Sequence, residues 1–198
     1  MASGQRTVAV LLFEDVEDID YCGPLSVFSI ANRGIDPEPF AIFTVSQMKR
    51  PFSTRNGVMI TPAYSFENHP HADIIVIPGG LGARREVHND TVKAWIVKNA
   101  ASAEIVLSVC TGSLLLGATG LLNGLQATTH HSSYDRLREI APAVHVVRDR
   151  RFVDNGTFVT AAGITAGIDA ALHLVGKLVN AECADKVKNI MEYTPAGS

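Results

Sequence analysis

The sequence predicts an α/β sandwich, in which a mostly parallel sheet is covered by helices on both faces. Short, continuous apolar runs rich in valine and isoleucine, the pattern of strands buried on both sides, alternate with longer stretches of helical pattern. This alternation is typical of parallel sheets, because the chain crosses back through a helix between strands. The chain has 198 residues, of which 46% are hydrophobic and 19% charged, enough to bury one core. We therefore expect one three-layer domain over residues 1–198.

Three segments fit buried strands: 7–13 (TVAVLLF), 72–80 (ADIIVIPGG) and 104–110 (EIVLSVC). Two Asn-Gly pairs, Asn56-Gly57 and Asn155-Gly156, lie between β-like runs. Because Asn-Gly is the strongest short signal for a tight hairpin turn, each pair predicts a hairpin beside the sheet.

Five segments have helical character: 23–34, 89–101, 111–120, 132–141 and 165–179. Gly23-Pro24 and Asn89-Asp90 are start signals, whereas Gly34 and Gly120 are stop signals. These positions set the expected ends of the first three helices.

Charge and composition exclude several classes of function. The 17 basic and 20 acidic residues give a formal net charge of −3, without a long tract of either sign, so we expect no nucleic-acid partner. The N-terminal segment lacks the pattern of a signal peptide, and no segment approaches the roughly 18 apolar residues of a membrane span. We expect a cytoplasmic protein with no membrane partner.

Cofactor and metal signals are missing from the sequence. Cys22, Cys110 and Cys183 form no CxxC pair, which favours reduced thiols over a disulfide framework or a zinc site. The seven histidines show no metal-ligand spacing, and the glycines of 161–169 (AAGITAGID) match neither common nucleotide-binding motif. We expect no metal and no cofactor.

Cys110 is the candidate nucleophile. It follows the strand 104–110, and function gathers at the carboxyl ends of strands in an open parallel sheet. Ser108-Val109-Cys110-Thr111-Gly112 repeats the spacing of the G-x-S-x-G nucleophile elbow with cysteine at its centre. The N–H groups that begin the next helix would lower the pKa of its thiol. The alternative is a buried cysteine that only packs, but the small neighbours and the turn favour a functional thiol.

The other two cysteines are expected to be structural. Cys183 lies in an amphipathic helical segment, and Cys22 lacks a setting like that of Cys110, although it could approach the site from the loop after the first strand.

Three backbone groups could stabilise a developing charge. Gly79-Gly80 makes a turn without side chains at the end of a neighbouring strand, and Thr111 follows the nucleophile, so their N–H groups are oxyanion-site candidates. Gly79-Gly80 could equally be only a tight turn. Gly163 and Ile164, at the tight entry to the last predicted helix, are candidates to line the pocket.

Asp20 is the first candidate to handle the proton. It lies in the acidic loop after the first strand, where its acidic neighbours fit a solvated surface, but Ile19 and Tyr21 place Asp20 nearest the apolar part. His130 and His131 follow a strand-like segment, and one of the two should face the site because side chains alternate along a strand. A lone histidine is more often structural, so both rank below Asp20.

On these residues the chain resembles the ThiJ/PfpI superfamily, relatives of the class I glutamine amidotransferases, and within it the isonitrile (isocyanide) hydratases. The matching segments span nearly the whole chain in the expected order: LFEDVEDIDYCGPLSVF, IIVIPGG, SVCTGSLLLGATGLLNGLQATTHH, TAAGITAGIDAALHLV and EYTP. The resemblance implies a flavodoxin-like sandwich and a homodimer.

For a hydratase, the resemblance implies that Cys110 attacks the terminal carbon of a small uncharged isocyanide, R–N≡C, to give a thioimidate. Asp20 would protonate or orient the substrate and then activate water, releasing an N-substituted formamide. A thiol and a carboxyl group suit this chemistry without a metal.

The chain departs from related patterns at three positions. His131 stands where hydratases carry an aromatic residue, so the resemblance does not determine the pocket lining or the size of the substrate. Thr111 stands where protease-like members carry histidine, which argues against a peptidase. Asp20 is one methylene shorter than the glutamate of the glyoxalase and deglycase branch.

Two other functions compete. AraC-type transcription regulators carry a similar N-terminal domain followed by a helix-turn-helix region. This hypothesis ranks second, because the sequence ends at Ser198 and a sensing domain without that region would have no output, although a piece of a longer regulator would have the same sequence pattern. A thiol sensor whose Cys110 oxidises reversibly is the third hypothesis.

Overall fold

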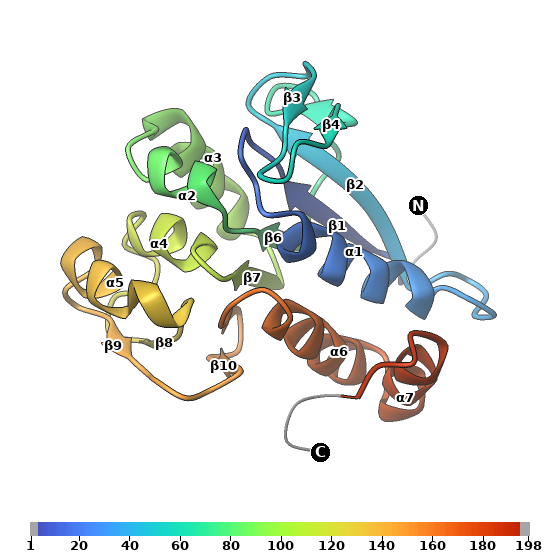
Figure 1. Ribbon diagram of the computed structural model, residues 1–198. Helices are drawn as coiled ribbons and strands as arrows, with labels where there is room; N and C mark the ends of the chain where they lie inside the picture. The colour runs from blue at the N-terminus through green and yellow to red at the C-terminus, as the bar shows by residue number, and fades with distance from the viewer. Residues whose placement is uncertain (1–3, 195–198) are drawn as a thin grey trace.

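A seven-stranded sheet forms the centre of the protein, described here from a computed structural model that covers residues 4–194 (Figure 1). The strand order is β10-β11-β7-β6-β1-β2-β5. All neighbours are parallel except β10 and β11, which pair antiparallel at one edge. The strands are β1 (Arg6–Leu11), β2 (Phe40–Ser46), β5 (Tyr64–Ser65), β6 (Ile74–Ile77), β7 (Ile105–Val109), β10 (Phe152–Asp154) and β11 (Phe158–Ala161).

Helices cover the sheet in two groups. One group packs α1 against α6 and α7, and the other surrounds α4 with α2, α3 and α5 (Figure 1). Their bounds are α1 (Asp18–Ala31), α2 (Leu81–Glu86), α3 (Asp90–Ala100), α4 (Gly112–Gly117), α5 (Tyr134–Ile140), α6 (Ala166–Leu178) and α7 (Ala181–Ile190). A short 3-10 helix, η1 (His131–Ser133), precedes α5. The predicted sandwich of a mostly parallel sheet between helices is confirmed.

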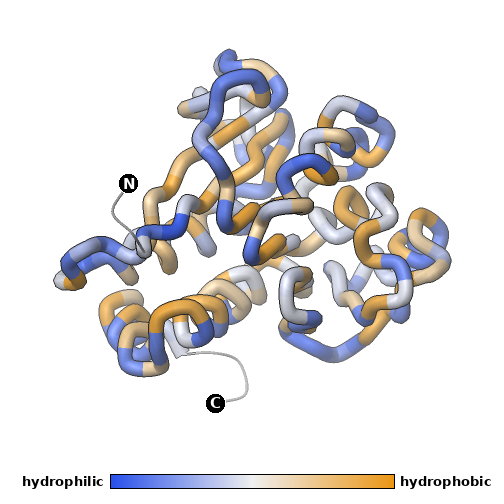
Figure 2. The backbone as a smooth tube through the Cα atoms, turned by 180° about the vertical axis from the view of Figure 1, so that it is seen from behind, coloured by the Kyte–Doolittle hydropathy of each residue, from blue (hydrophilic) through white to orange (hydrophobic). Residues whose placement is uncertain are grey.

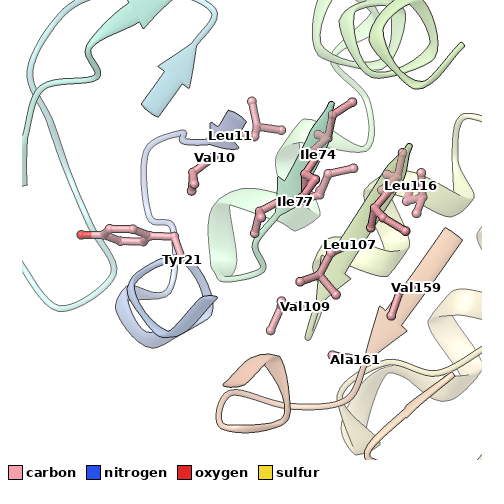
Figure 3. Packing of buried hydrophobic residues seen from close by; sticks show 14 of the residues in the cluster. Val10, Leu11, Tyr21, Ile74, Ile77, Leu107, Val109, Leu116, Val159 and Ala161 are labelled. Atoms are coloured by element: carbon pink, nitrogen blue, oxygen red, sulfur yellow. The ribbon is translucent and has the colours of Figure 1, made fainter. Parts of the chain in front are cut away.

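The central strands are buried on both faces, as their apolar sequences predict. Every residue of β6 and β7 is buried. Figure 3 shows Ile74 and Ile77 of β6 beside Leu107 and Val109 of β7, with Leu116 of α4 nearby. Figure 2 shows hydrophilic residues in many outer loops. Burial of β7 up to Val109 fixes the position of the turn that follows it.

Both predicted hairpins are present. Asn56-Gly57 joins β3 (Phe52–Ser53) to β4 (Met59–Ile60), and Asn155-Gly156 joins β10 to β11. Gly57 and Gly156 have φ values of +86° and +88°, a region that glycine adopts without a steric penalty.

The first predicted helix start is wrong. Helix α1 begins at Asp18 rather than at Gly23-Pro24, and Pro24 lies inside it. A proline there removes one hydrogen bond, which would run to the Asp20 carbonyl. The helix continues because it packs on α6: a Cβ atom at Gly23 would lie 3.0 Å from Ile168. Asp20 therefore belongs to a helix and not to the acidic loop.

Several elements differ from the sequence-based expectation. Strand β2 and helix α2 were not predicted, and the segment before His130 contributes β8 (Gln126–Ala127), which pairs with β9 (His145–Val146) outside the central sheet. Helices α3, α4 and α6 lie within their predicted segments. Within residues 4–194, no helix has the length and apolar character needed to cross a bilayer.

Candidate active site

Cys110 occupies a strained turn between β7 and α4. Its φ is +56°, in the left-handed region that non-glycine residues rarely adopt. Its N–H donates to the carbonyls of Ala161 (3.1 Å) and Ala162 (2.9 Å). Its carbonyl accepts from the hydroxyls of Thr129 (2.9 Å) and Ser113 (3.0 Å). The backbone is thus held from both sides.

Small residues around Cys110 permit this turn, as the elbow spacing predicts. A Cβ atom at Gly112 would overlap the carbonyl oxygen of Ile77 on the neighbouring strand. Ser108, two residues before the cysteine, is completely buried, and its hydroxyl has no hydrogen-bond partner within the described chain. The close approach of α4 to β6 therefore requires a residue without a side chain at position 112.

Asp20 is fully buried and lies beside the thiol. Its Oδ2 atom accepts a hydrogen bond of 3.0 Å from the Gly79 N–H. Its Oδ1 atom accepts no hydrogen bond from residues 4–194. Burial raises the pKa of Asp20 to about 7, against the lowering effects of Gly79 and the Cys110 thiol. A carboxyl group with this pKa exchanges protons near neutral pH.

The thiol is not acidified, contrary to the sequence-based expectation. Burial, and next the negative charge of Asp20, raise the pKa of Cys110 to about 12. Hydrogen bonds from the Ile164 and Thr111 N–H groups act in the opposite direction but do not prevail. Helix α4 has only six residues, so its dipole is weak. The resting thiol is therefore neutral.

The backbone N–H groups of Gly79 and Gly80 are already engaged, which corrects their assignment as free oxyanion donors. Gly79 donates to Asp20, and Gly80 donates to the Thr111 hydroxyl at 2.9 Å. A Cβ atom at Gly79 would lie 2.6 Å from the Thr111 nitrogen and 2.7 Å from Asp20 Oδ2. The two glycines thus orient Asp20 and Thr111. The Thr111 N–H faces the sulfur of Cys110.

A pocket of about 170 Å³ opens beside Cys110. It is lined by predicted residues, Gly80, Cys110, Thr111, His130 and Ile164, together with Glu17, Arg55, Leu81, Arg84 and Ser132, which the sequence did not single out. Asp20 lies outside this lining, buried behind the thiol.

Of the two histidines, His130 lines the pocket. Its Nδ1 atom lies 2.8 Å from the Ser132 hydroxyl, whereas His131 is exposed and does not line the pocket. Burial, and then the charges of His131 and Arg84, lower the pKa of His130. Gly163 lies behind His130, since a Cβ atom there would meet the imidazole. The predicted pocket residues His131 and Gly163 are therefore neighbours of the lining rather than parts of it.

The other two cysteines do not line the pocket. Cys22 is exposed on α1, and Cys183 is buried on α7. Across residues 4–194 no group of three or more His, Cys, Asp or Glu side chains is arranged to hold a metal ion.

The newly found lining residues come from segments joined only by tertiary contacts. Arg55 belongs to the β3–β4 hairpin. Its backbone N–H donates to the Val16 carbonyl at 2.9 Å, and Val16 in turn forms a β-bridge with Gly80. Arg84 lies on α2, a helix that the sequence pattern did not indicate. The Gly79-Gly80 turn was the one sequence signal close to them.

Sequence comparison finds known proteins that are similar to this chain. The family model described as the DJ-1/PfpI family matches residues 6–177. The isonitrile hydratase of Pseudomonas putida is 38% identical over 96% of this chain and 79% of its own length. The HTH-type transcriptional regulator GbdR of Pseudomonas aeruginosa is 27% identical over 95% of this chain but only 51% of its own length.

Solved structures show the same fold. A ThiJ/PfpI family protein from Pseudomonas syringae superimposes with a TM-score of 0.87 at 30% identity, over 98% of this chain and 80% of that one. An AraC family transcriptional regulator from Pseudomonas putida has a TM-score of 0.82 at 20% identity, over 94% of this chain and 99% of that one, which shows the fold alone. The family match over most of the chain, with the cysteine on its strained turn, shows that the chain belongs to the DJ-1/PfpI family.

Proposed function

We propose that this protein hydrates isocyanides to N-substituted formamides, with Cys110 as nucleophile and Asp20 as the group that moves protons. The observation that carries the proposal is the pairing of a neutral thiol, which lines a small pocket, with a buried carboxyl group beside it whose pKa is about 7. The 38% identity to an isonitrile hydratase over nearly the whole chain supports the same reaction class.

In the first step, sulfur and a proton add to the same carbon atom. The Asp20 carboxylate accepts the Cys110 proton as sulfur attacks the terminal carbon of R–N≡C, and the carbon receives that proton. The product is the thioimidate R–N=CH–S–Cys110. Because the addition consumes one thiol and no external acid, a thiol that is neutral at rest suits it.

In the second step, water replaces sulfur. Asp20, ionised again after delivering its proton, accepts a proton from water as the oxygen attacks the thioimidate carbon, and it passes this proton to the nitrogen to give R–NH–CH(OH)–S–Cys110. The C–S bond then breaks as the hydroxyl group becomes a carbonyl group, and the proton that the hydroxyl group loses goes to the sulfur. The products are R–NH–CHO and the free thiol, so the cycle closes with the addition of one water.

Incubation of the purified protein with a small aryl isocyanide, with formamide followed by chromatography, tests the proposal. Cys110→Ala should abolish product, and Asp20→Asn should lower the rate by about 100-fold or more, since positioned acid–base groups contribute on this order. Cys183→Ala and Asp18→Asn are matched controls that should keep the rate. Formamide from the Cys110→Ala variant would contradict the nucleophile assignment, and none from the parent would contradict the reaction.

A ligand-sensing role is the second candidate, because the regulator GbdR shares similarity with 95% of the chain. In that case the pocket would bind a small molecule without turnover. Saturable binding with no product and no mass change at Cys110 would favour this role. Reversible oxidation of Cys110 is less supported, since a buried thiol with a raised pKa holds little thiolate.

A further inference from the structure

Two arginine side chains line the pocket without a carboxylate to neutralise them. The arginines that form ion pairs within residues 4–194 lie elsewhere: Arg6, Arg85, Arg136, Arg138, Arg148 and Arg151. Arg55 and Arg84 are not among them, although both line the pocket beside Cys110. A lining built for a wholly apolar substrate would gain nothing from two such charges.

Arg84 is held in place by a neutral partner. Its Nη2 atom donates to the hydroxyl of Ser133 at 3.0 Å, and Ser133 is fully buried. The charge of Arg84 acts inside the site, because it contributes to lowering the pKa of His130. A guanidinium oriented by a hydroxyl keeps its remaining N–H groups and its full charge for a ligand.

One carboxylate, that of Glu17, also lines the pocket. Glu17 accepts a hydrogen bond of 3.2 Å from Asn56, makes no ion pair with either arginine, and contributes to raising the pKa of Asp20. Together with Arg55 and Arg84, the lining thus carries two positive charges and one negative charge. A ligand with a single carboxylate balances these charges, whereas a ligand with two negative charges exceeds them.

We infer that the substrate is an isocyanide whose R group carries a carboxylate, bound by Arg84 and Arg55 while the uncharged isocyanide end meets Cys110. This inference rests on the proposed function. It replaces the expectation of a substrate that is uncharged throughout, and it assigns the two arginines to substrate binding.

The experiment compares a short isocyanoalkanoate, such as 3-isocyanopropanoate, with its methyl ester. We expect kcat/KM for the carboxylate to exceed that for the ester by about tenfold or more, the range of one hydrogen bond to a charged group. Arg84→Gln and Arg55→Gln should each remove most of that preference, because they should lower kcat/KM for the carboxylate far more than kcat/KM for the ester. Arg136→Gln, which removes an exposed charge on α5, is the matched control.

A binding measurement separates this inference from the proposed reaction. N-formyl-β-alanine and its methyl ester, titrated by calorimetry, report recognition of the carboxylate without turnover. Binding of the acid alone, lost in Arg84→Gln, supports the inference even if no isocyanide is hydrated. Equal kinetics for acid and ester, or equal loss of both in the arginine variants, would overturn it while the hydratase proposal stands. Absence of binding and of preference would also overturn it.

Discussion

The Oδ2 atom of Asp20 accepts a hydrogen bond from the backbone N–H of Gly79 while the carboxyl group is completely buried. One N–H donor does not replace the water that a carboxylate loses on burial, so the neutral form is favoured. The pair thus keeps a proton in the site at pH values where an exposed aspartate has lost it.

Asp20 should make stability fall as pH rises. Its pKa is about 7 in the folded protein and 3.8 in the unfolded chain. The neutral carboxyl group therefore makes its full contribution to folding stability below about pH 4, and this contribution is lost as the pH rises to about 7. Asp20→Asn removes this dependence and should gain up to about 4 kcal/mol over the parent between pH 4 and pH 8. Urea unfolding at both pH values measures it. Parallel pH curves for parent and variant would contradict the buried carboxyl.

The rate of formamide formation should have an acid limb set by the same group. If the Asp20 carboxylate takes the thiol proton, kcat/KM should fall about tenfold per pH unit below pH 7. Above pH 7 it should level off, because the pKa of Cys110 lies near 12. Initial rates between pH 5 and pH 9 test this. A rate that rises toward low pH would instead require a protonated catalyst.

The elbow around Cys110 could be predicted because its determinants are adjacent in the sequence. The close packing of the turn on β6 requires an apolar strand, a small residue at position 108 and glycine at position 112, and all three can be read in one short segment of the sequence. The pKa of the thiol could not be predicted in this way. It depends on burial and on Asp20, which is 90 positions earlier in the sequence and buried by tertiary packing.

The rest of the site depends on contacts that local patterns do not encode. Alternation predicted that one of His130 and His131 faces the pocket, but only the packing of Gly163 against the imidazole identifies His130. Arg84 was not predicted because α2 has just six residues, too few for a clear helical period. The start of α1 was misplaced because contacts with α6 stabilise a helix through Pro24.

Relief of strain at Cys110 should be measurable. At a φ of +56°, glycine has less backbone strain than any residue with a Cβ atom. The free energy of unfolding of Cys110→Gly should therefore exceed that of Cys110→Ala by about 1 kcal/mol. Both variants should be inactive. Ser108 lies in the extended strand β7 and is the control position, because there Ser108→Gly should be less stable than Ser108→Ala. Equal stability of the two Cys110 variants would contradict strain at the turn.

Gly79 should be required for activity because it lies directly against Asp20 and Thr111. Gly79→Ala places a methyl group against the Thr111 nitrogen and Asp20 Oδ2, so both groups must shift. We expect a loss of about 100-fold in kcat, the cost of a misplacement near 1 Å. The control is Gly176→Ala on α6, where the nearest atom to an added Cβ would be the Cβ of Ala184 at 3.7 Å, an ordinary contact distance. Full activity of Gly79→Ala would show that the precise placement of Asp20 and Thr111 is not needed.

Tyr193 should stabilise the protein without affecting turnover. Its hydroxyl donates to Asp169 Oδ1 at 2.9 Å, and Arg151 donates to Oδ2 of the same buried carboxylate at 2.6 Å. Tyr193→Phe removes one hydrogen bond to a charged group and should lower the free energy of unfolding by about 1.5–3 kcal/mol. Asp169→Ala leaves both Tyr193 and Arg151 without their acceptor and should lower it further. Denaturant unfolding at pH 7 measures the two losses. Since Tyr193 does not line the pocket, formamide formation by Tyr193→Phe should match the parent below its unfolding temperature. A lower kcat in the fully folded variant would instead connect Asp169 on α6 to Ile164, the pocket residue just before that helix.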